Sequence, residues 1–108
     1  MNDGLSEKQW NEIFTQIARF PEVERAALFG SRALGTHKKA SDVDIVLYGE
    51  RVTPRVAAAV KFEIEEETYL PFFVDTVAYP TITNENFKQR IDAQSVIVYE
   101  REFGATAR

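Results

Sequence analysis

Apolar residues recur along the chain with two different periods, and their order predicts helices alternating with short strands. Between Ser6 and Pro21 they recur at intervals of three and four residues, the pattern of a helix with one buried face: Trp10, Ile13, Phe14 and Ile17. Ser6 and Gln9 have the spacing of a capping box, which predicts where this helix begins. The apolar run 23–29 is short and ends at Gly30, so it predicts a buried strand.

The same alternation continues to the C-terminal end. We expect, in chain order, a strand over 42–48, a helix from Thr53 to about Tyr69, a strand over 72–77, a helix from Asn84 to Ile91 and a strand over 95–99. Helices interleaved with strands predict an α/β or α+β fold, with a sheet covered by helices. The length of 108 residues favours a single domain over 1–108.

The strand predicted over 42–48 carries two carboxylates one residue apart. Because side chains alternate along a strand, Asp42 and Asp44 share one face, while Val43, Ile45 and Leu47 share the other and are expected to be buried. Neighbouring carboxylates repel each other, and a divalent cation removes that cost. Magnesium is usually shared between carboxylates and substrate phosphates, so the pair indicates phosphoryl or nucleotidyl transfer.

A glycine and a serine precede this pair at a fixed spacing, G-S-x10-D-x-D. Gly30 lets a phosphate approach the backbone with no side chain in the way, and Ser31 adds a hydroxyl donor. Arg32, beside the turn, is either a phosphate ligand or an exposed surface arginine, and Lys38 and Lys39 are expected in a solvated loop. The spacing therefore predicts a phosphate site next to a metal site.

A third acid, Asp75, lies in the apolar run 72–77. A carboxylate among apolar neighbours is costly to bury unless it is paired or bound to metal. On a strand beside the first pair, Asp75 would complete the metal site or accept the proton of an attacking hydroxyl. The alternative is a strand-end aspartate that caps a loop.

The composition limits which partners and which metals the protein is expected to bind. The net charge of −4 and a pI of about 5.0 argue against direct binding of nucleic acid. Without cysteine and with one histidine, His37, a metal must be held by oxygen, which indicates magnesium or manganese.

No apolar run approaches the roughly 20 residues of a membrane helix, and the acidic N-terminus lacks the apolar region of a signal peptide, so we expect a cytoplasmic protein.

Rival motifs fail at defining positions. The spacing from Gly30 to Gly35 is that of a P-loop, but Thr36 and His37 follow where Lys and Ser or Thr are required. The chain contains no G-x-G-x-x-G fingerprint, EF-hand loop or G-x-S-x-G elbow.

Gly30-Ser31, then Asp42-Val43-Asp44, with Asp75 on a later strand, resemble the polymerase-beta-type nucleotidyltransferase superfamily. The small size most resembles its minimal nucleotidyltransferases, and the segment 87–99 also looks typical of them. The resemblance implies the nucleotidyltransferase fold, a mixed β-sheet of about four strands flanked by helices. It further implies that Asp42 and Asp44 bind metal, that Asp75 is the third carboxylate, and that Gly30 and Ser31 hold the triphosphate of ATP.

Minimal members are commonly encoded beside a small helical HEPN protein, an RNase toxin, and act as its antitoxin, in several cases by adding AMP to a toxin tyrosine. The resemblance therefore implies Mg²⁺-dependent transfer of AMP from ATP to a hydroxyl of such a partner. Two alternatives stay open: transfer to a small-molecule hydroxyl, and neutralisation of the partner by binding alone.

The short chain is expected to need another chain to supply the acceptor, in a homo- or hetero-oligomer. Phe62, Tyr69 and Phe103 lie off the apolar stripes, where they either contact a partner or cover the edge of the core.

Overall fold

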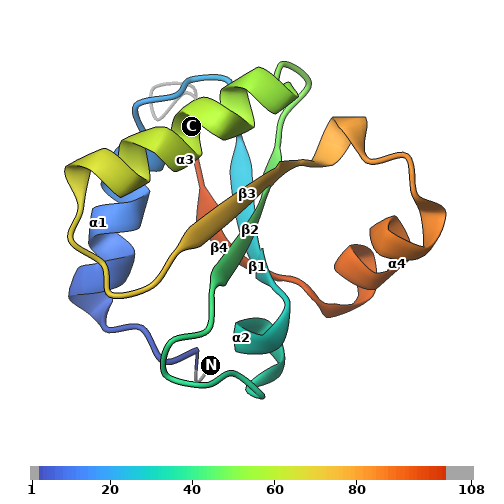
Figure 1. The fold of residues 1–108 in the computed structure, drawn as a ribbon. Helices are drawn as coiled ribbons and strands as arrows, with labels where there is room; N and C mark the ends of the chain where they lie inside the picture. Colours follow the sequence, from blue (N-terminus) through green and yellow to red (C-terminus); the bar gives the residue numbers. More distant parts are fainter. Residues whose placement is uncertain (1–2, 102–108) are drawn as a thin grey trace.

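One four-stranded sheet organises the protein, whose computed structural model describes residues 3–101 (Figure 1). The strands lie in the order β3-β2-β1-β4. The elements in chain order are α1 (Glu7–Ile17), β1 (Arg25–Phe29), α2 (Ser31–Leu34), β2 (Val43–Tyr48), α3 (Pro54–Glu67), β3 (Val74–Ala78), the 3-10 helix η1 (Tyr79–Thr81), α4 (Glu85–Gln94) and β4 (Val96–Glu100).

The sheet is mixed. β1 pairs antiparallel with both β2 and β4, whereas β2 and β3 are parallel and are joined by the crossover helix α3. The expected fold class, a mixed sheet of about four strands flanked by helices, is confirmed.

Each strand begins one or two residues later than the hydrophobic pattern predicts. Val23 shows the reason for the first strand. Its side chain is buried, but its N–H donates to the Phe20 carbonyl at 3.0 Å and closes a turn after α1. Val23 is thus buried in the core without pairing in the sheet. The apolar pattern alone does not distinguish a buried strand residue from a buried turn residue.

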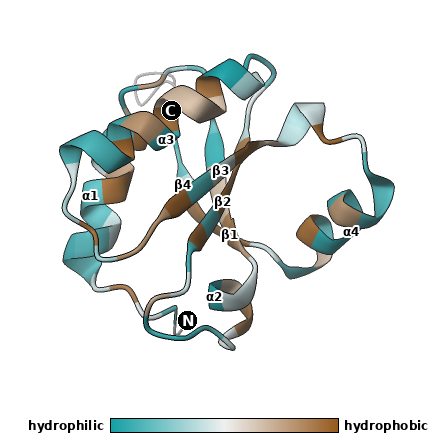
Figure 2. Cartoon of the chain, viewed as in Figure 1, coloured by the Kyte–Doolittle hydropathy of each residue, from teal (hydrophilic) through white to brown (hydrophobic). Residues whose placement is uncertain are grey.

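The larger core lies on the face of the sheet covered by α1 and α3 (Figures 1 and 2). Val43, Ile45 and Leu47 point into it and are completely buried, as expected from the alternation along β2. Burying a side chain of this size contributes roughly 1.5–3 kcal/mol. The opposite face of β2, which carries the acids, is therefore held on a rigid support.

A second, smaller core covers part of that opposite face, under α4. Ile91 of α4 packs there with Ala27 and Val46, and the rings of Phe29 and Phe87 meet edge to face with centroids 5.8 Å apart. Val46 is buried although it shares a face with Asp44. The strand that carries the acids is thus fixed from both sides.

The predicted helix caps are confirmed. Ser6 and Gln9 form a reciprocal capping box, and Thr53 and Asn84 each accept a hydrogen bond from the backbone three residues on. The third helix ends at Glu67, earlier than expected, because Thr68 is extended and its hydroxyl donates to a backbone carbonyl in the last turn.

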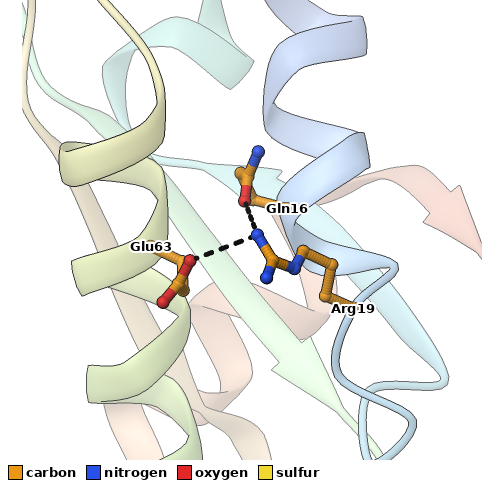
Figure 3. A network of polar contacts seen from close by, with 3 residues as sticks. All are labelled: Gln16, Arg19 and Glu63. Carbon is orange, nitrogen blue, oxygen red and sulfur yellow. Dashed lines mark hydrogen bonds and ion pairs between the residues drawn. The ribbon is translucent and has the colours of Figure 1, made fainter.

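One polar network joins α1 to α3 at the surface. Arg19 donates to Gln16 at 3.4 Å and pairs with Glu63 of α3 at 3.5 Å (Figure 3). Exposed pairs of this kind contribute less than about 1 kcal/mol, so the apolar contacts hold the two helices together.

Within residues 3–101, none of the helices combines the length and the apolar character needed to cross a membrane.

Candidate active site

The two halves of the G-S-x10-D-x-D pattern touch each other in the fold. Gly30 follows the last residue of β1 and adopts φ 78° and ψ −158°, a backbone conformation that side chains with a Cβ rarely adopt. A Cβ built on Gly30 would lie 2.6 Å from Oδ2 of Asp44. Gly30 therefore serves two purposes: it permits the turn into Ser31, and it leaves room for the carboxylate.

The sheet brings Asp75 beside Asp44, as expected. Asp44 of β2 pairs in register with Asp75 of β3 on one side and with Phe29 of β1 on the other. Paired residues of neighbouring strands point to the same face, so Asp44 and Asp75 share one face of the sheet. Asp42 immediately precedes β2 and is exposed, while Asp44 and Asp75 are half-buried.

The surroundings of Asp44 raise the pKa of its carboxyl. Burial raises the pKa of its carboxyl above the ordinary value, and the charges of Asp75 and Asp42 raise it further, in that order. Ionised Asp44 is therefore destabilised in the native state.

Lys61 of α3 is a member of this cluster that the sequence analysis missed. Its Nζ lies 2.9 Å from Oδ1 of Asp75, and this hydrogen bond, together with the charge of Asp75, raises the pKa of Lys61. Lys61 lies one turn beyond the buried Ala57 on the crossover helix between β2 and β3, and this position is the signal that could have pointed to it.

The donor set fits a hard divalent cation. The site offers carboxylate oxygens, the ligands that Mg²⁺ and Mn²⁺ prefer, and a cation would relieve the repulsion that raises the pKa of Asp44. The three acids are not already gathered around one point: among residues 3–101, no three acidic or histidine side chains lie close enough together to hold a metal ion. One oxygen of Asp75 is instead engaged by Lys61.

Arg32 lies elsewhere than expected. It is 1% exposed, so the prediction of an exposed surface arginine is wrong. All three guanidinium nitrogens donate to backbone carbonyls, with N–O distances of 2.8 Å to Asp3, 2.9 and 3.0 Å to Ser41 and 3.1 Å to Lys39. The guanidinium also lies over the ring of Phe72. Arg32 thus closes the loop before β2 through these backbone hydrogen bonds.

A pocket of about 320 Å³ opens next to the turn. Its walls come from the turn and α2, from the end of β1 and from α4: Gly30, Ser31, Leu34, Thr36, Phe29, Phe87, Arg90, Ile91 and Gln94. No site residue was predicted on α4. The contribution of this helix depends on how the chain packs over the sheet, which no local motif encodes.

The sequence model for the family described as "Polymerase beta, Nucleotidyltransferase" matches residues 11–103. The chain belongs to this family. The match includes the turn at Gly30 and Ser31 and all three acids. The resemblance drawn from the motifs is confirmed.

One named protein is similar in sequence to this chain. The protein named "Probable protein adenylyltransferase MntA" of Haemophilus influenzae is 35% identical over 74 residues, which are 68% of this chain and 64% of that protein. The aligned region thus spans less than two thirds of its relative.

Two solved structures have the same fold. A toxin–antitoxin crystal structure with AMP-PNP superposes with a TM-score of 0.70 at 20% identity, covering 86% of this chain and 74% of that one. A crystal structure of the MntA–HepT toxin–antitoxin gives 0.66 at 16% identity, covering 89% and 74%.

A Gly30→Ala substitution tests the contact between the turn and Asp44. We expect a loss of about 2 kcal/mol or more of folding stability, because an added Cβ is strained at this φ and meets the carboxylate. Gly35→Ala is the control, since Gly35 also has φ 78° but nothing lies within 4 Å of its added Cβ. Urea unfolding measures both. Equal losses for the two variants would contradict the contact.

An Arg32→Met substitution separates a structural arginine from a phosphate ligand. We expect a loss of about 2–4 kcal/mol of folding stability, because four backbone hydrogen bonds disappear from a buried site. Lys38→Met, an exposed residue of the loop that Arg32 closes, should change stability by less than about 0.5 kcal/mol. A stable Arg32→Met variant that has lost only nucleotide binding would restore the phosphate-ligand assignment.

The raised pKa of Asp44 has a consequence for stability. The native state binds the Asp44 proton more readily than the unfolded state, so stability from this group is complete below the unfolded pKa of about 3.9. It is lost as the pH rises through the native pKa. Without metal and near neutral pH, Asp44→Asn should therefore raise the Tm by roughly 1–4 °C, and the gain should vanish below about pH 4. A Tm difference that does not depend on pH would refute this assignment.

Proposed function

We propose that this protein is a Mg²⁺-dependent nucleotidyltransferase that moves AMP from ATP to a tyrosine hydroxyl of a HEPN-type partner, and that it acts as the antitoxin of that partner. The observation that carries the proposal is the contact of Gly30 with Asp44, which itself pairs in register with Asp75. In this proposal, the turn at Gly30 and the three carboxylates form one site. The named adenylyltransferase relative supports the choice of reaction.

In this proposal, some site residues bind the nucleotide that donates AMP, and others act on the hydroxyl that accepts it. Asp42 and Asp44 would hold Mg²⁺, which supplies positive charge against the phosphates of the donor. Gly30 lets a phosphate lie against the backbone, and the Ser31 hydroxyl donates a hydrogen bond to a phosphate oxygen. In this proposal Arg32 stabilises the loop and does not bind the nucleotide.

Asp75 is proposed as the carboxylate that acts on the acceptor hydroxyl. It would also be a third metal ligand if its hydrogen bond with Lys61 breaks. Its carboxylate accepts the proton of the attacking hydroxyl, while Lys61 fixes its orientation at 2.9 Å. The acceptor oxygen bonds to the α-phosphorus, the bond from that phosphorus to the bridging oxygen breaks, and pyrophosphate leaves. Positioning and charge neutralisation supply most of the rate enhancement in such transfers.

The acceptor is proposed to come from another chain. The described residues form one sheet with its helices, and the proposal takes 1–108 as a single minimal domain. Exposed aromatic side chains lie on and after α3, with Phe62 58% and Tyr69 99% exposed, and they are candidates for the partner interface. Phe103, the third predicted contact residue, lies outside the described residues. Because ATP is the donor, the proposal places the protein in the cytoplasm.

The experiment is a transfer assay with the product of the neighbouring gene, which the proposal expects to be a HEPN protein. The pair is incubated with Mg²⁺ and ATP labelled at the α-phosphate, and mass spectrometry locates the modified residue. We expect label on a partner tyrosine with the wild type, and at least a 100-fold lower rate with Asp42→Asn plus Asp44→Asn. ATP labelled at the γ-phosphate should leave no label, and Glu50→Gln, an exposed acid after β2, is the matched control.

The outcomes separate the alternatives. Absence of label on a folded, mixed partner contradicts the proposal. If the double variant still inhibits the partner RNase fully, neutralisation occurs by binding alone. Label that appears on a small-molecule alcohol and not on the partner assigns the acceptor to that class.

A further inference from the structure

The pocket between α2 and α4 is next to the proposed phosphate site but separate from the acids. Phe29, which lines the pocket, pairs in register with Asp44, so the pocket opens one strand away from the carboxylates. Gly30 and Ser31 line it as well. A molecule whose phosphates lie at the turn therefore has a continuous path into this pocket.

The chemistry of the walls favours a flat, largely apolar group with a polar edge. Phe29, Phe87, Leu34 and Ile91 supply apolar surface, and Arg90 and Gln94, one turn apart on α4, supply polar groups. The edge-to-face contact with Phe29 fixes the ring of Phe87. Leu34 is 54% exposed beside the pocket, so it has apolar surface that a ligand can cover.

The sheet order separates this pocket from the acceptor side. Asp75, Asp44 and Phe29 lie in one row across β3, β2 and β1. Asp75 and Lys61 lie on the β3 side of Asp44, whereas the pocket lies on the β1 side. A hydroxyl that transfers its proton to Asp75 must approach from the β3 side, which leaves the pocket to the donor.

A triphosphate alone does not fit these walls. Among the residues that line the pocket, Arg90 is the one cationic side chain, and a polyanion gains nothing from contact with Phe87 or Leu34. A volume of about 320 Å³ is at the lower end of small-molecule sites, which suits part of a nucleotide better than all of it.

We infer that this pocket holds the nucleoside part of the donor nucleotide, and that Arg90 and Gln94 set the preference for its base. The inference rests on the proposed function, since it takes the donor to be a nucleoside triphosphate. A side-chain amide pairs with adenine through two hydrogen bonds and a guanidinium pairs with guanine, so these two residues determine which base binds more tightly.

The test is calorimetric titration of the full chain with Mg²⁺-ATP, Mg²⁺-GTP and Mg²⁺-tripolyphosphate. We expect ATP to bind at least about 10-fold more tightly than tripolyphosphate, because the nucleoside adds its own contacts. Leu34→Ser should weaken ATP binding by about 5–10-fold and leave tripolyphosphate binding unchanged. Ile97→Ser is the control: Ile97 is 48% exposed on β4 and lies outside the pocket.

Base preference is tested with Gln94→Leu and Arg90→Leu. Each should change the ratio of ATP to GTP affinity by about 5-fold or more, the loss expected when a hydrogen-bonding edge is removed. Neither should change tripolyphosphate binding by more than about 2-fold.

The results distinguish the two levels of the proposal. If ATP and tripolyphosphate bind equally, or if Leu34→Ser weakens both equally, the pocket does not hold the nucleoside and the inference is overturned, while the proposed function stands. An unchanged ratio in both α4 variants overturns the role in base preference. If neither compound binds in the presence of Mg²⁺, the proposed function and the inference fail together.

Discussion

The close approach of Gly30 to the Asp44 carboxylate is the constraint on which the site depends. These residues are far apart in sequence, and the antiparallel pairing of β1 with β2 brings them together. A side chain at position 30 would meet Asp44 at 2.6 Å, so the turn and the acid fit only with glycine there. The contact brings a turn that suits phosphate next to a strand that suits metal, as the proposed single site requires.

The rest of the fold holds that contact in place at a cost in stability. Apolar side chains fix β2 from both faces, and parallel pairing places Asp75 beside Asp44. The same burial raises the pKa of Asp44, so the metal-free site is less stable than a neutral one would be. Lys61 offsets part of the charge from the side of Asp75. A loss of stability of this kind is common at sites that bind a charged ligand, because the charges that suit the ligand are unfavourable without it.

The sequence was informative where local rules apply. Strand alternation predicted which side of β2 is buried, capping residues predicted helix starts, and the run around Asp75 predicted a strand beside the first pair. The sequence did not predict the contacts between segments that are far apart along the chain. The carbonyls that engage Arg32 come from Asp3, Lys39 and Ser41, and no spacing rule predicts that set. The ion pair of Lys61 and the pocket wall formed by α4 likewise depend on how helices pack over the sheet.

The most direct test is a crystal structure of this protein with Mg²⁺ and a non-hydrolysable ATP analogue. We predict phosphates against Gly30 and Ser31, a cation bound by Asp42 and Asp44, and the nucleoside between α2 and α4. A nucleotide bound elsewhere, with the turn and the acids making no contact to it, would contradict the claim that they form one site.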